Sequence, residues 1–390
     1  MNDKIDLNYQ KANETDSFKV HNDFLNQLLL DTSHERMEKH YQLFQDSQNK
    51  YLKRILGKGF LKRGDAGLIF LSGKLTSENN STKKSNVIHL LGLSGAKKYI
   101  EGIIPYLDSN SYDLRYKAII AIGCPIGIFD SGYGGLSVFK EIQQLLPQYD
   151  YIYLGDNARV PYGTRSFEAV YNYTKQCVFK LFDLGCNLVI LACNTASAKA
   201  LRTIQQNDLP PGKKVLGVIR PTTEIIHNYT KTNKIGILAT TGTVKSESYK
   251  IEIHKFNPEI EVFQHDCPFW VPLVENNEIN TEGAHYFVQK DIHELLQKSD
   301  QIDTIVLACT HYPLLLPVIE KYVPKNVNII SQGPIVAKSL QEYLHRHAEI
   351  ETCCSQNSQL AFYTTDDPRD FESKAKIFFG KHVDASHISV

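Results

Sequence analysis

The chain has 390 residues, of which 42% are hydrophobic, and 43 basic and 43 acidic side chains give it a formal net charge of zero. This length predicts two or three packed domains. Because the chain carries no excess of positive charge, we expect neither a nucleic-acid partner nor binding to a membrane surface.

The N-terminus and the cysteines indicate a compartment. Residues 1–16 are polar and lack the apolar core of a signal peptide, and no apolar run approaches the roughly 18 residues of a membrane-spanning helix. Eight cysteines are scattered without CxxC pairs, which predicts reduced thiols rather than a disulfide framework or a zinc ribbon. We therefore expect a cytoplasmic protein.

Residues 1–123 have the pattern of a helical extension. Apolar side chains in residues 1–73 are spaced by threes and fours among charged ones, and residues 64–70 either end a helix or start a short strand. The polar segment 74–85 is expected to be an exposed loop. Residues 86–123 are similar to one HEAT-type helical pair, and a single pair cannot bury its own apolar face. We expect it to pack on the rest of the chain or on a protein partner, or residues 1–73 to supply degenerate neighbouring repeats; an unspecific helical extension is the alternative.

From Pro125 onwards strand and helix patterns alternate, which predicts an α/β fold with two doubly wound, pseudo-symmetric lobes built on parallel sheets. In the first half we expect strands at 126–129, 150–154, 187–192 and 214–218, with helices at 135–146, 166–184 and 195–206. In the second half we expect strands at 234–238, 260–264, 304–308 and 327–330, with helices at 243–255, across 282–299, after Pro313 and from Pro334. A late strand near 360 and a helix through 371–379 are expected to return to the first lobe. The predicted domains are the extension at 1–123, lobe A at 124–220 completed by 333–390, and lobe B at 221–332.

The two halves carry the same succession of motifs. Each begins with an Ile-Gly-Ile strand and a turn of small residues, and each later has an apolar strand that ends in Leu-Ala-Cys, at Cys193 and at Cys309. Polar residues follow both cysteines, as they do at the carboxyl ends of buried parallel strands. Two similar lobes that face each other would bring the two thiols to opposite sides of one cleft. That arrangement suits a reaction that handles a proton on both faces of a carbon.

Polar and glycine-rich turns follow the first two predicted strands of the first half, 126–129 and 150–154. Asp130 and Ser131 end the first strand, where glycines let a ligand approach the backbone before the next helix. A phosphate-binding loop is not predicted, because neither GxGxxG nor Gly-Lys-Ser/Thr is present. The turn after the second strand holds Tyr162 between Pro161 and Gly163, and an ordinary packed loop tyrosine is the alternative interpretation.

The residues after the two cysteines are compact hydrogen-bonding groups. Asn194, Thr195, Thr310 and His311 could hold a carboxylate or an ammonium group, and the imidazole could stabilise charge beside its neighbouring thiol. A thiol of ordinary pKa is only slightly ionised at neutral pH, so a catalytic thiol needs such help. A buried cysteine is most often a small hydrophobe, but two at matching places favour catalysis.

Six segments stand in the order GIFDSGYGGLSV, YLGDNARVPYG, ILACNTASA, GILATTGTV, CPFWVPLVE and LACTHYPLL. Together they resemble bacterial glutamate racemase, of the cofactor-independent aspartate/glutamate racemase superfamily, over roughly residues 125–380. The resemblance implies interconversion of L- and D-glutamate by two cysteine acid/bases, with no cofactor or metal, in an enzyme that supplies D-glutamate for peptidoglycan and so for cell shape. A homodimer is expected.

The resemblance also assigns residues. Cys193 would serve the D-isomer and Cys309 the L-isomer, with Asp130, Glu275 and His311 as polar helpers of the thiols. The implied substrate-binding residues are Asp130, Ser131, Tyr162, Gly163, Asn194, Thr195, Thr310 and His311, with Thr241 or Thr243 from the second lobe. Arg220 departs from the family pattern, since many members carry an acidic residue there.

Three alternatives remain open on the sequence. An aspartate racemase of the same superfamily fits the fold, although the TTGTV and PYG segments favour glutamate. The chain could also be a helical protein-binding scaffold fused to an incidental racemase body, although both cysteines are intact. A cysteine hydrolase would need one nucleophile and one base, and would leave the second strand-end cysteine without a role.

Overall fold

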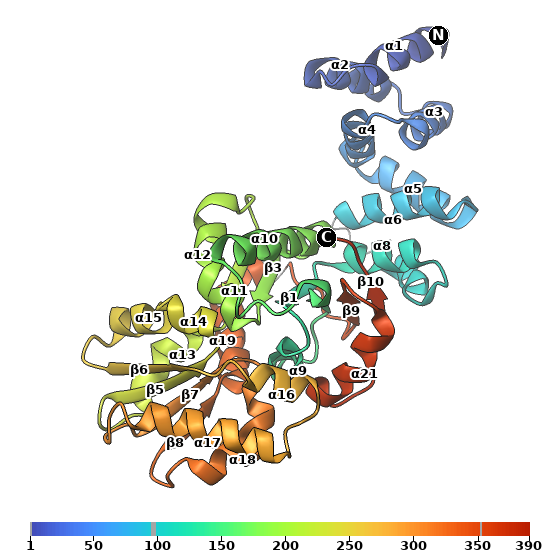
Figure 1. The fold of residues 1–390 in the computed structure, drawn as a ribbon. Coiled ribbons are helices and arrows are strands. Elements are labelled where there is room, and N and C mark those ends of the chain that lie inside the picture. The colour runs from blue at the N-terminus through green and yellow to red at the C-terminus, as the bar shows by residue number, and fades with distance from the viewer. Residues whose placement is uncertain (1, 95–98, 352) are drawn as a thin grey trace. The chain divides into compact units, whose positions relative to one another are not determined.

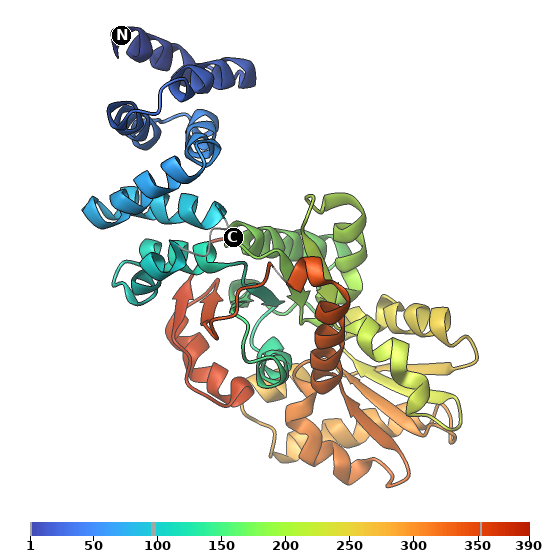
Figure 2. The same ribbon diagram turned by 180° about the vertical axis from the view of Figure 1, so that it is seen from behind.

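The computed structural model describes residues 2–94, 99–351 and 353–390. The chain divides into two compact units, residues 1–124 and residues 125–390, and each is described by itself. Figures 1 and 2 show the helical first unit and the α/β second unit from opposite sides. The predicted fold class, an α/β body with parallel sheets preceded by helices, is confirmed.

The first unit is built from consecutive helices, of which α1–α6 each have 12 or 13 residues. Its described helices are α1 (Asn2–Asn13), α2 (Phe18–Leu29), α3 (His34–Asp46), α4 (Lys50–Lys62), α5 (Asp65–Ser77), α6 (Ser81–Leu93), α7 (Ile100–Ile103), the 3₁₀ helix η2 (Ile104–Asp108) and α8 (Tyr112–Ile122). Helix α2 packs on α4, α4 on α6, and α6 on α8, so neighbouring pairs bury one another's apolar faces, as in an α-solenoid. Phe60 lies at the centre of this core, stacked on His40 with ring centroids 4.2 Å apart.

Two local predictions in this unit are corrected. Residues 64–70 neither end a helix nor start a strand, because Gly64 adopts a φ of 58° and α5 begins at Asp65. The polar segment 74–85 is not a loop, since α5 continues to Ser77 and α6 begins at Ser81. Polar side chains of this segment lie at the helix ends, where they can cap them: the Asn80 side chain accepts a hydrogen bond from the Lys83 amide at the start of α6. Part of the predicted HEAT-type pair, residues 95–98, lies outside the described residues.

A six-stranded parallel sheet forms lobe A of the second unit. Its order is β10-β9-β2-β1-β3-β4, and the strands are β1 (Ile126–Asp130), β2 (Tyr151–Gly155), β3 (Leu188–Leu191), β4 (Lys214–Gly217), β9 (Leu360–Thr364) and β10 (Ala385–His387). The helices of this lobe are α9 (Gly135–Leu145), α10 (Phe167–Asp183), α11 (Asn194–Lys199), α12 (Leu201–Thr203), α13 (Ile219–Ile225), α20 (Ala348–Glu351) and α21 (Pro368–Phe379). The late strand β9 pairs with β2, which returns the C-terminal segment to this sheet.

A four-stranded parallel sheet forms lobe B. Its order is β6-β5-β7-β8, with β5 (Lys234–Ala239), β6 (Glu261–Asp266), β7 (Thr304–Ala308) and β8 (Asn328–Ser331). The remaining helices are α14 (Thr241–Lys245), α15 (Ser248–Phe256), α16 (Trp270–Glu275), α17 (Glu282–Leu296), α18 (Leu316–Tyr322) and α19 (Gln332–Arg346). Helix α19 crosses back from lobe B and packs on α9 and α13, and its path is visible in Figures 1 and 2.

The two sheets repeat one topology. The order β2-β1-β3-β4 in lobe A matches β6-β5-β7-β8 in lobe B, so β3 and β7 occupy equivalent positions. Both strands are buried along their whole length, as expected for parallel strands covered by helices on both faces. The predicted pseudo-symmetry is thus confirmed: Cys193 comes two residues after the end of β3, and Cys309 comes one residue after the end of the equivalent strand β7.

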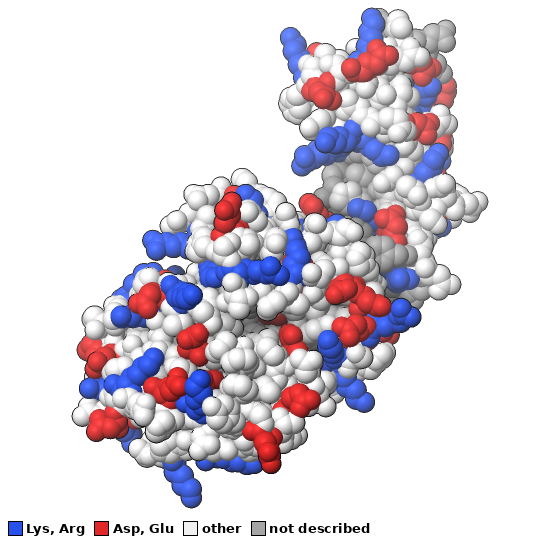
Figure 3. Space-filling view, in the orientation of Figure 1, with Lys and Arg blue, Asp and Glu red and all other residues white. Residues whose placement is uncertain are grey.

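The sequence pattern did not predict every element of this unit. Helices α13 and α16 and the short strand β10 were not foreseen, and the predicted helix at 243–255 is divided into α14 and α15. The division falls at Glu247, whose φ of 56° interrupts the helix. On the face of the molecule shown in Figure 3, basic and acidic side chains are interspersed over the second unit. Among the described residues, no helix is long and apolar enough to cross a membrane.

Candidate active site

A small cavity of about 40 Å³ lies between the two lobes, at the carboxyl ends of their strands. Cys193 and Cys309 both line it, each only 6% exposed. The other lining residues are Ser131, Val160, Pro161, Tyr162, Gly163, Asn194, Thr195, Thr240, Val271, Glu275, Thr310 and His311. The parallel strands therefore deliver one buried thiol from each lobe to a common cavity.

The Cys193 thiol is held at the start of a helix. Its Sγ accepts a hydrogen bond from the Ala196 amide at 3.4 Å, so the side chain caps α11, and the Ser131 hydroxyl lies 3.4 Å from the same sulfur. Burial and then the nearby Asp130 carboxylate raise the pKa of Cys193 to about 12, although both hydrogen bonds act in the opposite direction. Cys193 is thus a protonated thiol at neutral pH in the absence of a ligand, and it can act as an acid.

The Cys309 thiol has different neighbours. His311 Nδ1 lies 3.9 Å from its sulfur, and His311 Nε2 lies 3.0 Å from Oε1 of Glu275, at the end of α16. Burial alone would lower the pKa of His311, but the hydrogen bonds and negative charges of Cys309 and Glu275 outweigh burial and raise this pKa. A protonated imidazole beside Cys309 provides positive charge for a thiolate formed there.

Among the residues that the structure describes, Asn194, which lines the cavity, and Asp130, which lies beneath its lining, each have a buried side-chain atom without a hydrogen-bond partner. Oδ2 of Asp130 accepts from the Gly132 amide at 2.9 Å, but Oδ1 is unpartnered, and the residue is 1% exposed. Oδ1 of Asn194 accepts from the Tyr249 hydroxyl at 2.6 Å, while its Nδ2 donates to nothing. Leaving such atoms unsatisfied costs about 1–3 kcal/mol each, so they indicate a polar ligand. A carboxylate oxygen fits an ammonium group, and an amide NH₂ fits a carboxylate.

The comparisons with known proteins agree with this geometry. The family model for Asp/Glu/Hydantoin racemase matches residues 126–340. A glutamate racemase of Levilactobacillus brevis is 37% identical over 268 residues, which cover 68% of this chain and 95% of that protein. A glutamate racemase of Geobacter metallireducens is 39% identical over 255 residues, 65% of this chain and 92% of that protein. The chain belongs to the Asp/Glu/Hydantoin racemase family.

Solved racemase structures have the same fold. Glutamate racemase isoform RacE1 from Bacillus anthracis matches with a TM-score of 0.63 at 34% identity, covering 68% of this chain and 98% of that one. A Francisella tularensis glutamate racemase in complex with D-glutamate matches with a TM-score of 0.61 at 32% identity, covering 69% and 98%. The family resemblance inferred from the sequence motifs is therefore confirmed.

In this racemase fold a cluster of threonine hydroxyls joins the two lobes beside the cavity. Thr195 Oγ1 lies 2.9 Å from Thr240 Oγ1 and 3.4 Å from Thr243 Oγ1. Thr240, which the sequence analysis did not name, lines the cavity and caps α14, whereas Thr241 Oγ1 donates to Asp266 at 2.6 Å. The turn Thr240–Thr243 offers three hydroxyls in four residues, and the strand pattern alone does not fix which one faces the ligand.

The loop predicted to hold a fixed tyrosine closes another side of the cavity. The Tyr162 hydroxyl donates to Asp156, and the carbonyl of Gly163 accepts from the Gly242 amide of lobe B at 2.8 Å. Tyr162 therefore contributes its buried ring to the racemase site while its hydroxyl is occupied within lobe A. Arg220, the departure from the family pattern, is exposed and paired with Glu224 at 2.8 Å, and it does not line the cavity.

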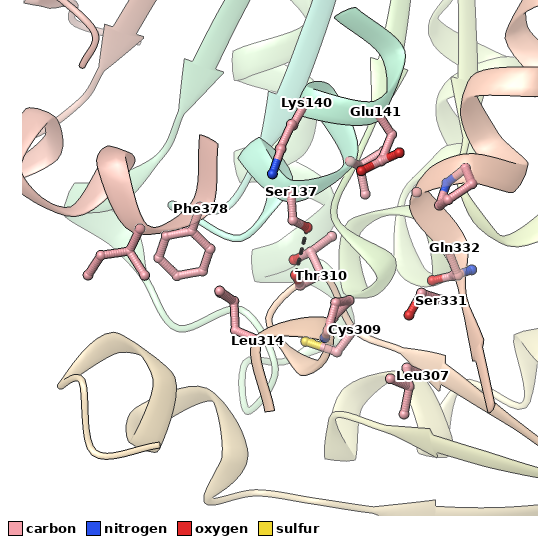
Figure 4. Close-up of a pocket in the computed structure, with 15 residues that line it drawn as sticks. Ser137, Lys140, Glu141, Leu307, Cys309, Thr310, Leu314, Ser331, Gln332 and Phe378 are labelled. Carbon is pink, nitrogen blue, oxygen red and sulfur yellow. Dashed lines mark hydrogen bonds between the residues drawn. The ribbon is translucent and has the colours of Figure 1, made fainter. Parts of the chain in front are cut away.

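A second cavity of about 290 Å³ lies behind Cys309 and Thr310, and Figure 4 shows the residues that line it. The Ser137 hydroxyl of α9 donates to the Thr310 carbonyl at 2.8 Å, which ties lobe A to the segment after β7. Lys140 and Glu141 of the same helix also line the cavity, together with residues from α19 and α21. The backbone that carries Cys309 is thus held from lobe A as well as from lobe B.

Proposed function

We propose that this chain is a glutamate racemase, which interconverts L-glutamate and D-glutamate by proton transfer between its two thiols and the Cα atom. One observation carries this proposal: Cys193 and Cys309 follow equivalent strands and line one cavity, which Asn194, with its unpartnered Nδ2, also lines. The names of the family and of the relatives support the reaction type and the substrate.

The proposed binding mode satisfies the unpartnered atoms. The ammonium group of the amino acid lies against Asp130 Oδ1, and a carboxylate accepts from Asn194 Nδ2. Ser131, Thr195, Thr240 and Thr310 supply further hydroxyls around the same space. With these groups fixed, the Cα–H bond points toward one thiol and the opposite face of the carbon points toward the other.

In the proposed mechanism one thiolate removes the Cα proton, and the electron pair of the broken C–H bond remains on Cα as a planar carbanion. The opposite thiol then donates its proton to the other face, which forms the enantiomer and leaves a thiolate on that side. From L-glutamate, Cys309 acts as the base and Cys193 as the acid, and the roles exchange from D-glutamate. The environments of the two thiols suit the reaction of L-glutamate. Burial keeps Cys193 protonated, as the acid must be, and His311 provides positive charge beside Cys309, which favours the thiolate of the base.

The decisive experiment follows the circular dichroism of L-glutamate incubated with the purified full-length chain without added pyridoxal phosphate. We expect the signal to decay to zero, and the Cα proton to exchange with deuterium in D₂O. L-aspartate serves as the parallel substrate, since faster turnover of aspartate would assign the chain to the alternative racemase. Absence of both exchange and signal decay in the folded protein would overturn the proposal.

We propose further that the product D-glutamate feeds peptidoglycan synthesis and so cell-wall biogenesis and cell shape. The enzyme acts in the cytoplasm in this proposal, because the Cys193 and Cys309 thiols must stay reduced to carry protons. We also propose a homodimer. Sedimentation velocity of the purified chain tests that assembly, since a monomer at assay concentration would contradict it.

We propose that the helical first unit binds a protein partner. Stacked helical pairs present extended surfaces, and a shallow cavity of about 420 Å³ between α3 and α5 is lined by Met37, Ile69 and Phe70 among others. Ile69 is 63% exposed, although it is a large apolar side chain. Affinity capture with the full chain, compared with the Ile69→Asp variant, tests this role; captured proteins unaffected by the substitution would argue against this face.

A further inference from the structure

A group of three side chains with metal-binding donors lies in lobe B, outside the cavity that contains the two thiols. His265 is on β6, Cys267 directly follows this strand, and Asp291 is on α17, which packs against β6. One ligand atom from each of the three lies within 4.8 Å of the other two. None of the three lines the proposed active site.

The burial and hydrogen bonding of this group leave a carboxylate oxygen without a partner. Cys267 is 1% exposed and Asp291 is 5% exposed. Asp291 Oδ1 lies 3.3 Å from His265 Nε2, whereas the buried Oδ2 has no hydrogen-bond partner in the described part of the chain. A buried carboxylate with one long hydrogen bond is poorly compensated, and a bound cation would satisfy the remaining oxygen.

The spacing of these atoms suits a four-coordinate ion. Metal–ligand bonds of about 2.0–2.3 Å in a tetrahedral zinc site place neighbouring ligand atoms about 3.3–3.8 Å apart. The 3.3 Å between His265 Nε2 and Asp291 Oδ1 matches one edge of such a tetrahedron. Glu294 is three residues after Asp291 on α17, and its Oε2 lies 3.7 Å from His265 Nε2, where it can supply a fourth ligand.

The donor types indicate which ion would bind. An imidazole nitrogen, a thiolate and a carboxylate together are the mixed set that Zn²⁺ prefers, whereas Mg²⁺ and Ca²⁺ take oxygen ligands. We propose that His265, Cys267 and Asp291 form a Zn²⁺ site in lobe B, with Glu294 or a water molecule as the fourth ligand. Binding displaces the thiol proton of Cys267 and the Nε2 proton of His265.

A bound ion would be structural and would fix the segment that reaches the active site. The Cys267 carbonyl accepts from the Tyr312 hydroxyl at 3.1 Å, and its amide donates to the Ala239 carbonyl at 2.9 Å. Three residues later α16 begins, and it ends at Glu275, which contacts His311. The zinc site would thus anchor one end of the element that positions the partner of His311.

The test uses Co²⁺ as a spectroscopic probe of the full-length chain, after chelator treatment and in the presence of a non-thiol reductant. Thiolate ligation produces a near-ultraviolet charge-transfer band, and we expect this band to appear and to be displaced by Zn²⁺. Cys267→Ser should abolish it, and His265→Gln should weaken Co²⁺ binding more than about tenfold. Matched controls are Cys353→Ser, which removes an exposed thiol, and His293→Gln, which removes an exposed imidazole on α17; both should retain the band.

A second measurement keeps the test decisive if Cys267→Ser does not fold. Because an ion that binds only the folded state stabilises it, Zn²⁺ should raise the Tm of the parent chain and of His293→Gln, and should leave that of His265→Gln unchanged. A band that is absent from the parent chain, that persists in Cys267→Ser, or that is lost in Cys309→Ser would overturn the proposal. So would an equal Tm shift in both histidine variants. These readouts do not use racemisation, so failure of the zinc site is distinguishable from failure of the proposed activity.

Discussion

Replacing Asp130 by asparagine tests how the protein sets the protonation state of Cys193. Burial is the largest cause of the raised pKa of this thiol, and the charge of Asp130 is the next. An opposite charge at short range lowers a carboxyl pKa by about 1–3, and we take an effect of about one, in the raising direction, for the like charge of Asp130 because burial dominates here. Asp130→Asn keeps the size of the side chain and a carbonyl acceptor for the Gly132 amide, so it removes mainly the charge.

The expected result is a more reactive Cys193. Since the pKa of about 12 is far above pH 8, lowering it by one unit raises the thiolate fraction at pH 8 about tenfold. Iodoacetamide reacts with the thiolate, but a thiolate of lower pKa is a weaker nucleophile, so the reaction rate at Cys193 should rise about three- to fourfold. Peptide-resolved mass spectrometry separates this site from the exposed Cys353. The matched control is Asp384→Asn, at a side chain that is 98% exposed, and it should leave the rate at Cys193 unchanged.

An unchanged or slower rate in folded Asp130→Asn would refute the charge argument. Burial raises the pKa of Asp130 as well, and the charge of His311 lowers it. A rate that does not change would mean that Asp130 holds its own proton at pH 8 and acts as a hydrogen-bond donor. In either case Asp130→Asn should lower kcat more than it raises KM, because help with proton transfer is felt mainly in the transition state.

Three further predictions address the other parts of the site. Cys193→Ser and Cys309→Ser should each abolish racemisation. Elimination of a leaving group from Cβ of a glutamate analogue needs only one base, so each variant should still catalyse it with one enantiomer, and the two variants should prefer opposite enantiomers. A shared preference would contradict two opposed bases. His311→Asn should lower kcat more than it raises KM. Cys309 and Glu275 outweigh burial and raise the pKa of His311 to about 10, so the protonated imidazole stabilises the folded chain. This contribution to the free energy of unfolding is fully present below about pH 6.5 and is lost as the pH rises toward about 10. His311→Asn should remove it, which urea unfolding from pH 6 to 10 measures. Residues 125–390 alone should retain racemisation, since relatives of about that length are complete proteins; a folded but inactive truncation would show that the first unit is needed.

The sequence was sufficient to predict the features that depend on periodicity. Apolar runs bounded by turns located β3 and β7 to within a residue or two, and the matching Leu-Ala-Cys endings placed Cys193 and Cys309 at equivalent positions. Both features follow from strand physics, because a buried parallel strand is a continuous apolar run whose carboxyl end must then turn. The family resemblance named Glu275 and His311 as helpers of the thiols, but their pairing was not predicted, since 36 positions separate them and no local pattern joins them.

The features that the sequence did not predict depend on three-dimensional proximity or on competition between local structures. Thr240 lines the cavity, whereas the Thr241 hydroxyl is turned to Asp266, and this difference depends on the fold of the turn after β5. The polar segment 74–85 became two helix ends because each helix buries its apolar face on a neighbouring pair, which outweighs the local turn propensity. Asp291 approaches His265 and Cys267 only through the packing of α17 on β6.

The topology relates the two thiols, but their surroundings differ, and this difference bears on the kinetics of the proposed racemase. Cys193 caps a helix beside Ser131, whereas Cys309 lies beside the His311–Glu275 pair. The two singly ionised forms of the site therefore have different free energies, so kcat and KM should each differ between the L- and D-substrates. Enantiomers have equal free energies in water, however, so kcat/KM must be the same in both directions. If an asymmetric pair of thiols lowers KM for one enantiomer, kcat for that enantiomer must therefore fall by the same factor. The ratios of kcat and of KM between the two enantiomers thus report how unequal the thiols are.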